Sequence, residues 1–214
     1  MVSKQKIIKI LDILEKTHGE TMLEEFSHFT PFQVVIATLL SARTKDATVI
    51  PIVVDLFSKY PTVYDLNKLT IVQLEKWFYR IGFFRAKAKN VKKLCKIIIE
   101  DFDGLVPDTL EELLTLPGVG RKTANCVLAY AFKKPAIAVD IHVHRIVNKG
   151  RLHWMDTKNP DETEQELMRL VPKKRWRDVN KLLVDHGQRI CAPIRPKCWD
   201  CGITKFCEYK DKKL

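Results

Sequence analysis

The chain has 214 residues, 46% of them hydrophobic, which is enough for the core of one large domain or two modest ones. Lysine and arginine total 37 against 26 acidic residues, a formal net charge of +11. This surplus favours a polyanionic partner, although a solvated surface explains the charge alone equally well. No apolar run approaches the roughly 20 residues of a membrane span. Charges also interrupt the apolar residues of positions 1–19, unlike a signal peptide, so we expect an intracellular protein without a membrane partner.

The basic residues are spread along the chain rather than confined to a tail. Folding would allow such residues to gather on one face. The candidates for this basic face are Arg80, Arg85, Lys87, Lys89, Arg121, Lys122, Arg145, Lys149, Arg151, Arg189, Arg195 and Lys197.

The first part of the chain predicts amphipathic helices. Residues 4–17 carry isoleucine and leucine at the spacing of one helical face. Thr30 followed by Pro31 indicates an N-cap and a proline in the first turn, opening an apolar helix. Thr70 and Gln73 have the spacing of a capping box, which predicts a further helix directly after Thr70.

The helical pattern continues to the C-terminal part. Gly82 is expected to end the preceding helix, and residues 84–102 form a strong helix that stops near Gly104. Asp108 and Glu111 have the chemistry of an N-cap and its third residue.

Two more helices are expected near the end of the chain. Asn159-Pro160 opens one of them, and residues 174–186 form the last long one. Only short β-branched pieces such as residues 136–139 favour strands, so the sequence predicts an all-α protein.

Six cysteines divide into two groups. Cys95 and Cys126 lie in apolar helical patterns and are predicted to be small core residues. The other four follow one another at intervals of six, two and five intervening residues: Cys191, Cys198, Cys201 and Cys207. In an intracellular protein this spacing favours a metal over disulfides. Four thiolates bind either zinc or a [4Fe–4S] cluster, and the local pattern leaves both open.

A glycine hairpin lies between two predicted helices, at residues 116–120. Gly118 and Gly120 permit a tight turn and the close approach of another backbone. The following helix is expected to begin near Gly120, and its free N–H groups would form an anion site that suits a phosphate. An interhelical turn without a ligand is the simpler interpretation of the glycines alone. The segment RIGFFRAKA at residues 80–88 has a similar glycine turn.

Two polar residues are expected at the starts of helices. Lys122 is expected in the first helical turn after the hairpin, where a lysine is ordinarily a surface residue or a phosphate contact. Asp140 precedes the helical segment IHVHRIVNK and is predicted to be its N-cap.

Five segments together resemble a known family. LPGVGRKTAN, TPFQVVIATLLSA, IGFFRAKA, AIAVDIHVHRI and the final CEYK occur here in the same order as in endonuclease III-type glycosylases. These enzymes are DNA glycosylase/AP lyases of the helix–hairpin–helix DNA glycosylase superfamily. The resemblance covers nearly the whole chain, from about residue 5 to 210.

The resemblance implies roles for the two polar residues. The family's nucleophilic lysine corresponds to Lys122, and its catalytic aspartate corresponds to Asp140. A carboxylate facing the sugar stabilises an oxocarbenium-like transition state and moves protons. Family members without this lysine tend only to remove the base, so the resemblance implies a bifunctional glycosylase and AP lyase in base excision repair. It would remove oxidised pyrimidines from duplex DNA through a lysine Schiff base and cleave the strand by β-elimination.

The cysteine spacing matches the family's [4Fe–4S] site, so the resemblance implies that the four clustered cysteines hold this cofactor. It also implies that the hairpin contacts DNA and that the loop between the first two cysteines contacts phosphates. The residues concerned are Gly118, Val119, Gly120, Arg121, Arg195 and Lys197. A proline-shaped metal loop with solvated charges is the alternative for Arg195 and Lys197.

Two further positions correspond to residues that fill the gap left by a flipped nucleotide. They are Arg43 and Phe83, where bacterial members usually carry glutamine and leucine. Arg43 would donate hydrogen bonds to the orphaned base, and Phe83 would wedge into the stack. A surface arginine and a core aromatic are the alternatives. These departures leave the preferred lesion and the preferred opposite base undetermined. Separately, His142 and His144 are not included among the catalytic residues.

The resemblance also implies two helical lobes. A six-helix lobe with the hairpin would span residues 22–133, and residues 1–21 plus 134–214 would form the lobe that holds the cluster. The expected partner is double-stranded DNA with a damaged or abasic nucleotide, bound by a cytoplasmic, nucleoid-associated monomer. One alternative is a mismatch (T or U opposite G) or 8-oxoguanine glycosylase on the same fold. The non-enzymatic alternative is a helix–hairpin–helix DNA-binding protein with a structural metal.

Overall fold

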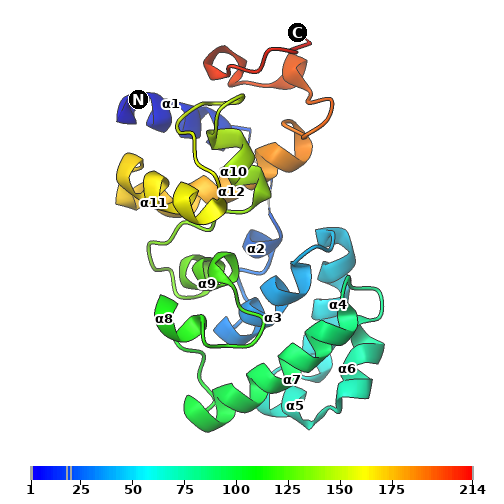
Figure 1. Ribbon diagram of the computed structural model, residues 1–214. Helices are drawn as coiled ribbons and strands as arrows, with labels where there is room; N and C mark the ends of the chain where they lie inside the picture. Colours follow the sequence, from blue (N-terminus) through cyan, green and yellow to red (C-terminus); the bar gives the residue numbers. More distant parts are fainter. Residues whose placement is uncertain (1, 18, 20, 214) are drawn as a thin grey trace. The chain divides into compact units, whose positions relative to one another are not determined.

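The computed structural model describes residues 2–17, 19 and 21–213, with only the backbone of residue 23. These residues form α-helices joined by turns, short 3-10 and π-helical segments, and one isolated bridge between Asn148 and Met155 (Figure 1). No β-strand occurs among them, residues 136–139 included. The all-α prediction is therefore confirmed.

The contacts between residues divide the chain into two compact units. Unit 1 comprises residues 1–21 and 135–214, and unit 2 comprises residues 22–134. The predicted lobes, residues 22–133 and residues 1–21 plus 134–214, stay a prediction.

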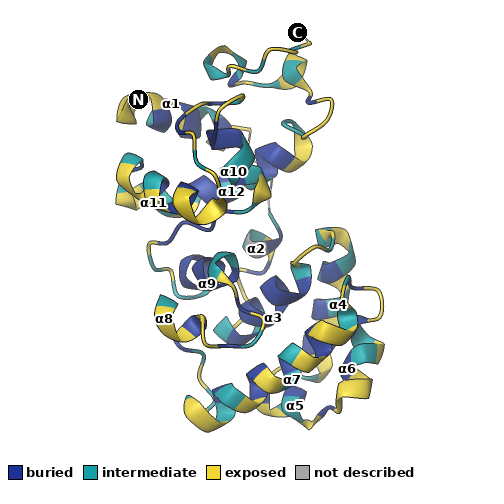
Figure 2. Ribbon diagram, viewed as in Figure 1, coloured by how far each residue is buried: buried dark blue, intermediate teal, exposed yellow. Residues whose placement is uncertain are grey.

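Unit 2 is built around the apolar helix α3. The helices of this unit are α2 (Met22–Glu25), α3 (Pro31–Ser41), α4 (Asp46–Lys59), α5 (Val63–Lys68), α6 (Ile71–Phe78), α7 (Phe84–Asp101), α8 (Leu110–Leu113) and α9 (Arg121–Cys126). A π-helical turn, Val127–Ala131, continues α9 directly. Helix α3 packs against α4, α7, α9 and this π turn, and is buried almost all round (Figure 2). A helix with apolar residues on every side is stable only in such a position.

Unit 1 packs α1 (Lys4–Glu15) and α10 (Ile141–Val147) against α12 (Trp176–Arg189), while α11 (Pro160–Leu170) contacts α10. Fully buried residues of α1, including Ile7, Ile10 and Leu11, enter one core with residues of α10 and α12. Each such side chain contributes about 1.5–3 kcal/mol through its burial. Three 3-10 turns complete the unit: Lys173–Arg175, Cys198–Asp200 and Thr204–Phe206.

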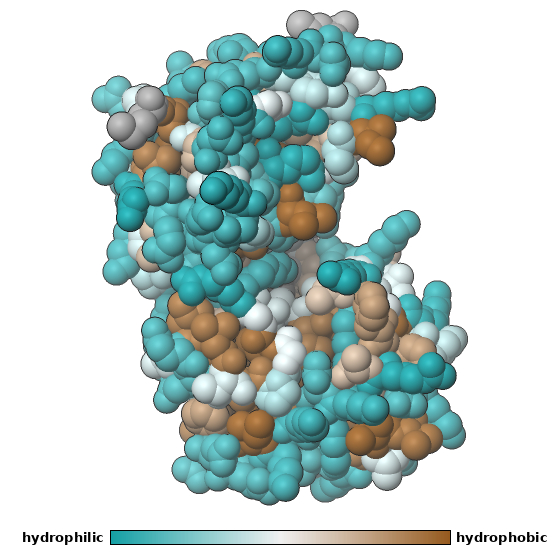
Figure 3. Space-filling view, viewed as in Figure 1, coloured by the Kyte–Doolittle hydropathy of each residue, from teal (hydrophilic) through white to brown (hydrophobic). Residues whose placement is uncertain are grey.

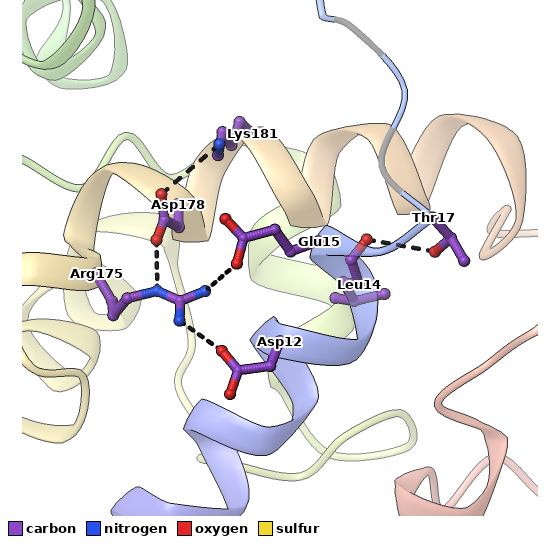
Figure 4. A network of polar contacts seen from close by, with 7 residues as sticks. All are labelled: Asp12, Leu14, Glu15, Thr17, Arg175, Asp178 and Lys181. Carbon is purple, nitrogen blue, oxygen red and sulfur yellow. Dashed lines mark hydrogen bonds and ion pairs between the residues drawn. The ribbon is translucent and has the colours of Figure 1, made fainter.

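A charged network joins the two ends of the chain within unit 1. The Arg175 guanidinium donates to Asp12 at 2.6 Å and to Glu15 at 3.2 Å, both on α1, and also to Asp178 on α12 (Figure 4). The arginine is mostly buried, so this network is less screened by solvent than an ordinary surface pair. It fixes the N-terminal helix against the helix that leads to the cysteines.

Most local predictions are confirmed. Thr30 and Thr70 each form a complete capping box, Asn159 caps α11, and Cys95 and Cys126 are fully buried. The predicted cap at Asp108 is wrong, because Thr109 accepts from the Glu112 backbone N–H instead. The adjacent threonine has equivalent chemistry, and it is the residue directly before the helix, with an extended backbone.

Observed helix ends differ from the predicted ones by one to three residues, as is usual where terminal turns fray or tighten. The first helix stops at Glu15, and the last long helix begins at Trp176 after a 3-10 turn. None of the helices formed by the described residues combines the length and apolar character that spanning a membrane requires.

Candidate functional site

The predicted glycine hairpin joins α8 to α9 in unit 2. Gly118 has a positive φ of 82°, and a Cβ added there would lie 2.8 Å from Asn90 Nδ2 and 3.0 Å from Leu39 Cδ1. Gly118 therefore serves both the turn and the close packing of the hairpin on α3 and α7. The Val119 N–H donates to the Leu116 carbonyl at 3.0 Å, which closes the turn.

Lys122 lies at the start of the helix that follows the hairpin. Gly120 is the N-cap of α9, and its own Cβ position would face open space among the described residues. Arg121 and Lys122 occupy the first two helical positions and are half-buried, whereas the next eight residues are buried. This arrangement places both basic residues at the positive end of the helix dipole, and the buried residues behind them anchor the helix.

Asp140 lies in unit 1 as the N-cap of α10. Its Oδ1 accepts from the backbone N–H of His142 at 2.8 Å and of Val143 at 2.9 Å, so the capping prediction is confirmed. The residues before it, 136–139, are buried, and the Ala138 carbonyl accepts from Asn180 Nδ2 at 2.8 Å. The Asp140 carboxylate is thus held at a fixed point on a rigid segment.

The two histidines after Asp140 have packing and bridging roles. A Cβ on Gly187 of α12 would lie 2.7 Å from the His142 side chain, so the glycine admits this histidine. His144 Nδ1 lies 2.7 Å from Thr163 Oγ1, and Asn148 Nδ2 lies 3.1 Å from the same nitrogen. These contacts link α10 to α11.

The four clustered cysteines line one pocket of unit 1. Three basic residues, Arg151, Lys197 and Lys212, also line it, and no described lining residue is acidic. The Tyr209 N–H donates to Cys207 Sγ at 3.4 Å, and His186 Nε2 lies 3.7 Å from Cys201 Sγ. Within the described part of the chain, however, no three potential ligands converge as closely as a bound metal ion requires.

The donor set of this pocket fits an anionic thiolate-bound group. Burial raises the pKa of the Cys191 and Cys201 thiols, so deprotonation needs a compensating positive charge. The Arg151 guanidinium supplies such a charge beside Tyr209, 3.7 Å from its ring centroid. The Nε atoms of Arg151 and Arg145 are buried and lack a hydrogen-bond partner among the described residues. Burial lowers the pKa of His186 to about 4, which keeps this neighbour neutral.

The loop between the first two cysteines presents exposed basic residues. Arg195 and Lys197 are exposed, whereas Pro196 between them is buried in the wall of the cysteine pocket. The Lys197 N–H donates to the Ile190 carbonyl at 2.9 Å and closes the loop. Arg195 has a positive φ of 52°, a conformation that costs free energy in a residue with a Cβ.

Arg43 and Phe83 lie beside each other in unit 2. The Arg43 guanidinium is 5.6 Å from the Phe83 ring centroid, within the range of a cation–π contact. Phe83 is 64% exposed, so the core-aromatic interpretation is wrong. Both residues have positive φ, 55° and 58°. Arg43, Phe83 and Arg195 are three of the six described non-glycine residues with positive φ, and such strain persists where the surroundings enforce it.

The predicted basic face needs correction at several positions, among them Arg151, which is half-buried beside Tyr209. Lys87 is buried, Arg145 is half-buried and donates to the Cys191 carbonyl at 2.7 Å, and Arg189 is ion-paired with Asp185. The partners of Lys87 and Arg145 lie more than 40 residues away in the chain, so only the fold brings them together, whereas Asp185 and Arg189 have the i,i+4 spacing of a helical ion pair. The face shown in Figure 3 is nevertheless mainly hydrophilic, with separate hydrophobic areas.

The chain is similar to proteins of base excision repair. The sequence profile described as "HhH-GPD superfamily base excision DNA repair protein" matches residues 36–173. Endonuclease III of Thermotoga maritima is 46% identical over 179 residues, which is 84% of this chain and 83% of the relative.

Solved structures agree with this likeness. A trapped endonuclease III–DNA covalent intermediate matches with a TM-score of 0.88 and 37% identity over 97% of both chains. A thermostable thymine-DNA glycosylase matches with a TM-score of 0.83 and 31% identity over 96% of both chains. At these coverages both matches extend over unit 1 and unit 2.

Proposed function

We infer that the chain is a bifunctional DNA glycosylase and AP lyase. The reason is that it belongs to the HhH-GPD superfamily of base excision DNA repair proteins, and within it to the endonuclease III type. It is a base excision repair enzyme that acts on duplex DNA. The observation that carries the two activities is Lys122 at the second position of α9, directly after the hairpin. A lysine there supplies a nucleophile for base removal and, afterwards, an imine for strand cleavage.

Base removal requires the damaged nucleotide to leave the stack. The unprotonated Lys122 Nζ then forms a bond to the anomeric carbon, C1′, while the glycosidic C1′–N bond breaks. The bonding electrons leave with the base, which takes up a proton. The positive helix end and the neighbouring Arg121 favour the unprotonated amine that this attack needs.

Asp140 is proposed to act as the carboxylate of the reaction. Its orientation is fixed by the two N–H groups that it caps. A fixed anion stabilises positive charge that develops on the sugar ring as the base departs. It also accepts and returns the protons that move as the sugar ring opens to the imine.

Strand cleavage follows from the chemistry of the imine. The C1′=Nζ bond withdraws electrons, so the C2′ proton becomes acidic and is removed by a base. The electrons of the C2′–H bond form the C1′=C2′ bond of an enamine, while the imine electrons move to Nζ. The nitrogen pair then restores the C1′=Nζ bond, a C2′=C3′ double bond forms, and the C3′–O bond breaks to release the phosphate. Hydrolysis of the remaining imine returns Lys122. No external oxidant or metal-bound species is needed for these steps.

The four cysteines that line the pocket would hold a [4Fe–4S] cluster. Such a group, when bound, supplies a rigid cross-link between the end of α12 and the C-terminal turns. Arg145 and Arg151 would offset its negative charge. The rigid loop would then present Arg195 and Lys197 to DNA phosphates at low entropic cost.

The hairpin is proposed to fix the register of the DNA. The hairpin residues Gly118, Val119 and Gly120, with the Arg121 side chain, would contact phosphates close to the damaged nucleotide, although the Val119 N–H itself is used by the Leu116 carbonyl. Arg43 and Phe83 would fill the space that this nucleotide vacates. We propose that the protein binds DNA as a monomer and that its substrates are oxidised pyrimidines.

A second candidate is removal of thymine opposite guanine. It is favoured by the likeness to the thermostable thymine-DNA glycosylase and by Arg43, which would donate to guanine. Lys122 is common to both candidates, so the lesion and not the reaction class separates them.

The test is cleavage of duplexes carrying thymine glycol, 8-oxoguanine, thymine opposite guanine, or an abasic site. Base release and strand scission are measured separately at excess enzyme. The proposal predicts base release from thymine glycol and β-elimination at the abasic site, and loss of both in Lys122→Gln. Preferential release of mismatched thymine would instead support the second candidate. Base release without scission in the wild type would refute the lyase assignment.

A further inference from the structure

A buried lysine lies behind the two residues proposed to fill the gap in the DNA. Lys87 on α7 is only 7% exposed. Its Nζ donates to the Leu40 carbonyl at 2.8 Å, to the Ala42 carbonyl at 2.6 Å and to Thr44 Oγ1 at 3.3 Å. The three acceptors match the three N–H donors of an ammonium group. Burial lowers the pKa of Lys87 to about 8, and at neutral pH the group still carries its charge.

These acceptors belong to the end of α3 and the turn that carries Arg43. Leu40 is in the last turn of α3, and Ala42 is its C-cap. Carbonyls at a helix C-terminus lack intrahelical partners and carry partial negative charge, which a cation stabilises. Lys87 therefore holds the Arg43 turn at two of its backbone carbonyls.

Thr44 connects the same lysine to the second turn. Its Oγ1 accepts from the Gly82 backbone N–H at 3.1 Å, next to Phe83. A Cβ on Gly82 would lie 3.0 Å from the Arg43 carbonyl oxygen, so the two turns are in close contact. One ammonium and one hydroxyl thus join the backbones on which Arg43 and Phe83 sit, both with positive φ.

We propose that Lys87 and Thr44 are positioning residues that hold the Arg43 and Phe83 turns as one rigid gap-filling unit. The proposal rests on the proposed function, because it assigns a purpose to residues that fill the DNA stack. Burying a charge is costly, and an apolar side chain of similar length would serve packing alone. A lysine here instead specifies the positions of strained backbone segments. Neither residue touches the reacting atoms.

The experiment compares two substrates that differ only in what faces the lesion. In one, the lesion is opposite a normal base, so flipping leaves an orphaned base and a gap to fill. In the other, it is opposite an abasic spacer, so no orphaned base is left. Single-turnover rates are measured for the wild type, Lys87→Met and Thr44→Val, with thermal melting as a check of folding.

Both variants are expected to react about ten- to a hundredfold more slowly on the paired duplex, the size of effect that misplacement by about 1 Å produces. On the spacer substrate they should remain within about threefold of the wild type, since no orphaned base then has to be held in place after flipping. The matched control is Lys92→Met. Lys92 is also on α7 and donates to a backbone carbonyl, that of Asn67, but it contacts neither turn. It should match the wild type on both substrates.

A second readout reports gap filling directly. The base opposite the lesion is replaced by 2-aminopurine, whose fluorescence rises on unstacking, in proteins that also carry Lys122→Gln so that the substrate stays intact. Lys87→Met and Thr44→Val should give less of this rise at saturating protein than Lys92→Met. Equal loss on both substrates, or an unchanged 2-aminopurine signal, overturns the positioning role. Failure of the wild type to release a base or cleave either substrate overturns the proposed function instead.

Discussion

Asp140 has an observed capping role and a proposed catalytic role, and substitutions can separate the two. One carboxylate oxygen accepts two backbone N–H groups at the start of α10, which is a structural task. The negative charge of the same group is the property that the proposed chemistry needs. Asparagine caps helices about as well as aspartate but carries no charge. Alanine can neither cap the helix with its side chain nor supply a charge.

The unfolding free energy of Asp140→Asn is therefore expected to lie within about 0.5 kcal/mol of the wild-type value. That of Asp140→Ala should be lower by about 1 kcal/mol. Both should lower the single-turnover rate of base release by about 10²–10⁴-fold, the usual size of a lost acid–base group. Denaturant unfolding and product analysis measure the two effects. A fully active Asp140→Asn would show that the carboxylate has only its capping role.

The lowered pKa of Lys87 predicts how the unfolding free energy depends on pH. Its pKa is lowered from 10.5 to about 8 by burial, so between these values the unfolded chain holds a proton that the folded chain has released. Unfolding free energy therefore rises with pH across this window. Relative to Lys87→Met, the wild type should gain about 1–3 kcal/mol from pH 8 to 10.5, since each pKa unit corresponds to about 1.4 kcal/mol. The three acceptors favour the ammonium and offset part of this gain. A difference between the two proteins that is flat with pH would contradict the lowered pKa.

At the scale of elements, the local signals explain which predictions succeeded. Caps such as Thr30 and Asn159 depend on three or four neighbouring residues, so they were predictable. The capping prediction for Asp108 was wrong because the adjacent Thr109 can cap the same helix. A choice between two neighbouring capping residues cannot be made from the sequence alone. The roles of Lys122 and Asp140 came only from the family resemblance, since their local patterns equally describe a surface lysine and a cap.

Lys87 was misassigned to the basic surface although a signal was present. It lies on the buried stripe of α7 together with Val91, Leu94 and Ile98, at intervals of four, three and four residues. A lysine on an apolar stripe indicates a buried charge with partners elsewhere. Those partners lie more than 40 residues away in the chain, and only the fold brings them together.

The cysteine pocket is expected to depend on its ligands as a set. Cys207→Ser should lose the visible absorbance and iron of the purified protein and lower its melting temperature, because the proposed cluster would join α12 to the C-terminal turns. Cys126→Ala removes a fully buried cysteine of unit 2 and should keep both signals. Iron analysis of protein purified without oxygen gives the result. Stoichiometric zinc, or full iron in Cys207→Ser, would contradict the assignment.

At the scale of the whole molecule, the charge of +11 bears on how the protein finds DNA. Long-range attraction is independent of sequence, speeds association and weakens with salt. Some basic residues are committed to internal contacts, as Arg145, Arg175 and Lys87 are, so the net charge overstates what is available to phosphates.

Binding to duplex DNA should weaken steeply as salt rises. Replacing Arg195 or Lys197 with alanine should reduce the slope of log Kd against log salt by about one for each lost phosphate contact. Lys59→Ala should leave the slope unchanged, because Lys59 is paired with Asp55 on α4. Fluorescence anisotropy at several salt concentrations measures the slopes. An effect of Lys59→Ala equal to those of the loop variants would contradict a specific contact by this loop.

The most direct test of the central claim is to locate the covalent bond to DNA. The protein is mixed with an abasic duplex, the imine is reduced with borohydride, and the digested adduct is sequenced by mass spectrometry. The account predicts that the sugar fragment is attached to Nζ of Lys122, in the peptide that follows the hairpin. Attachment to the N-terminal amine or to another lysine, or strand cleavage without any adduct, would contradict it.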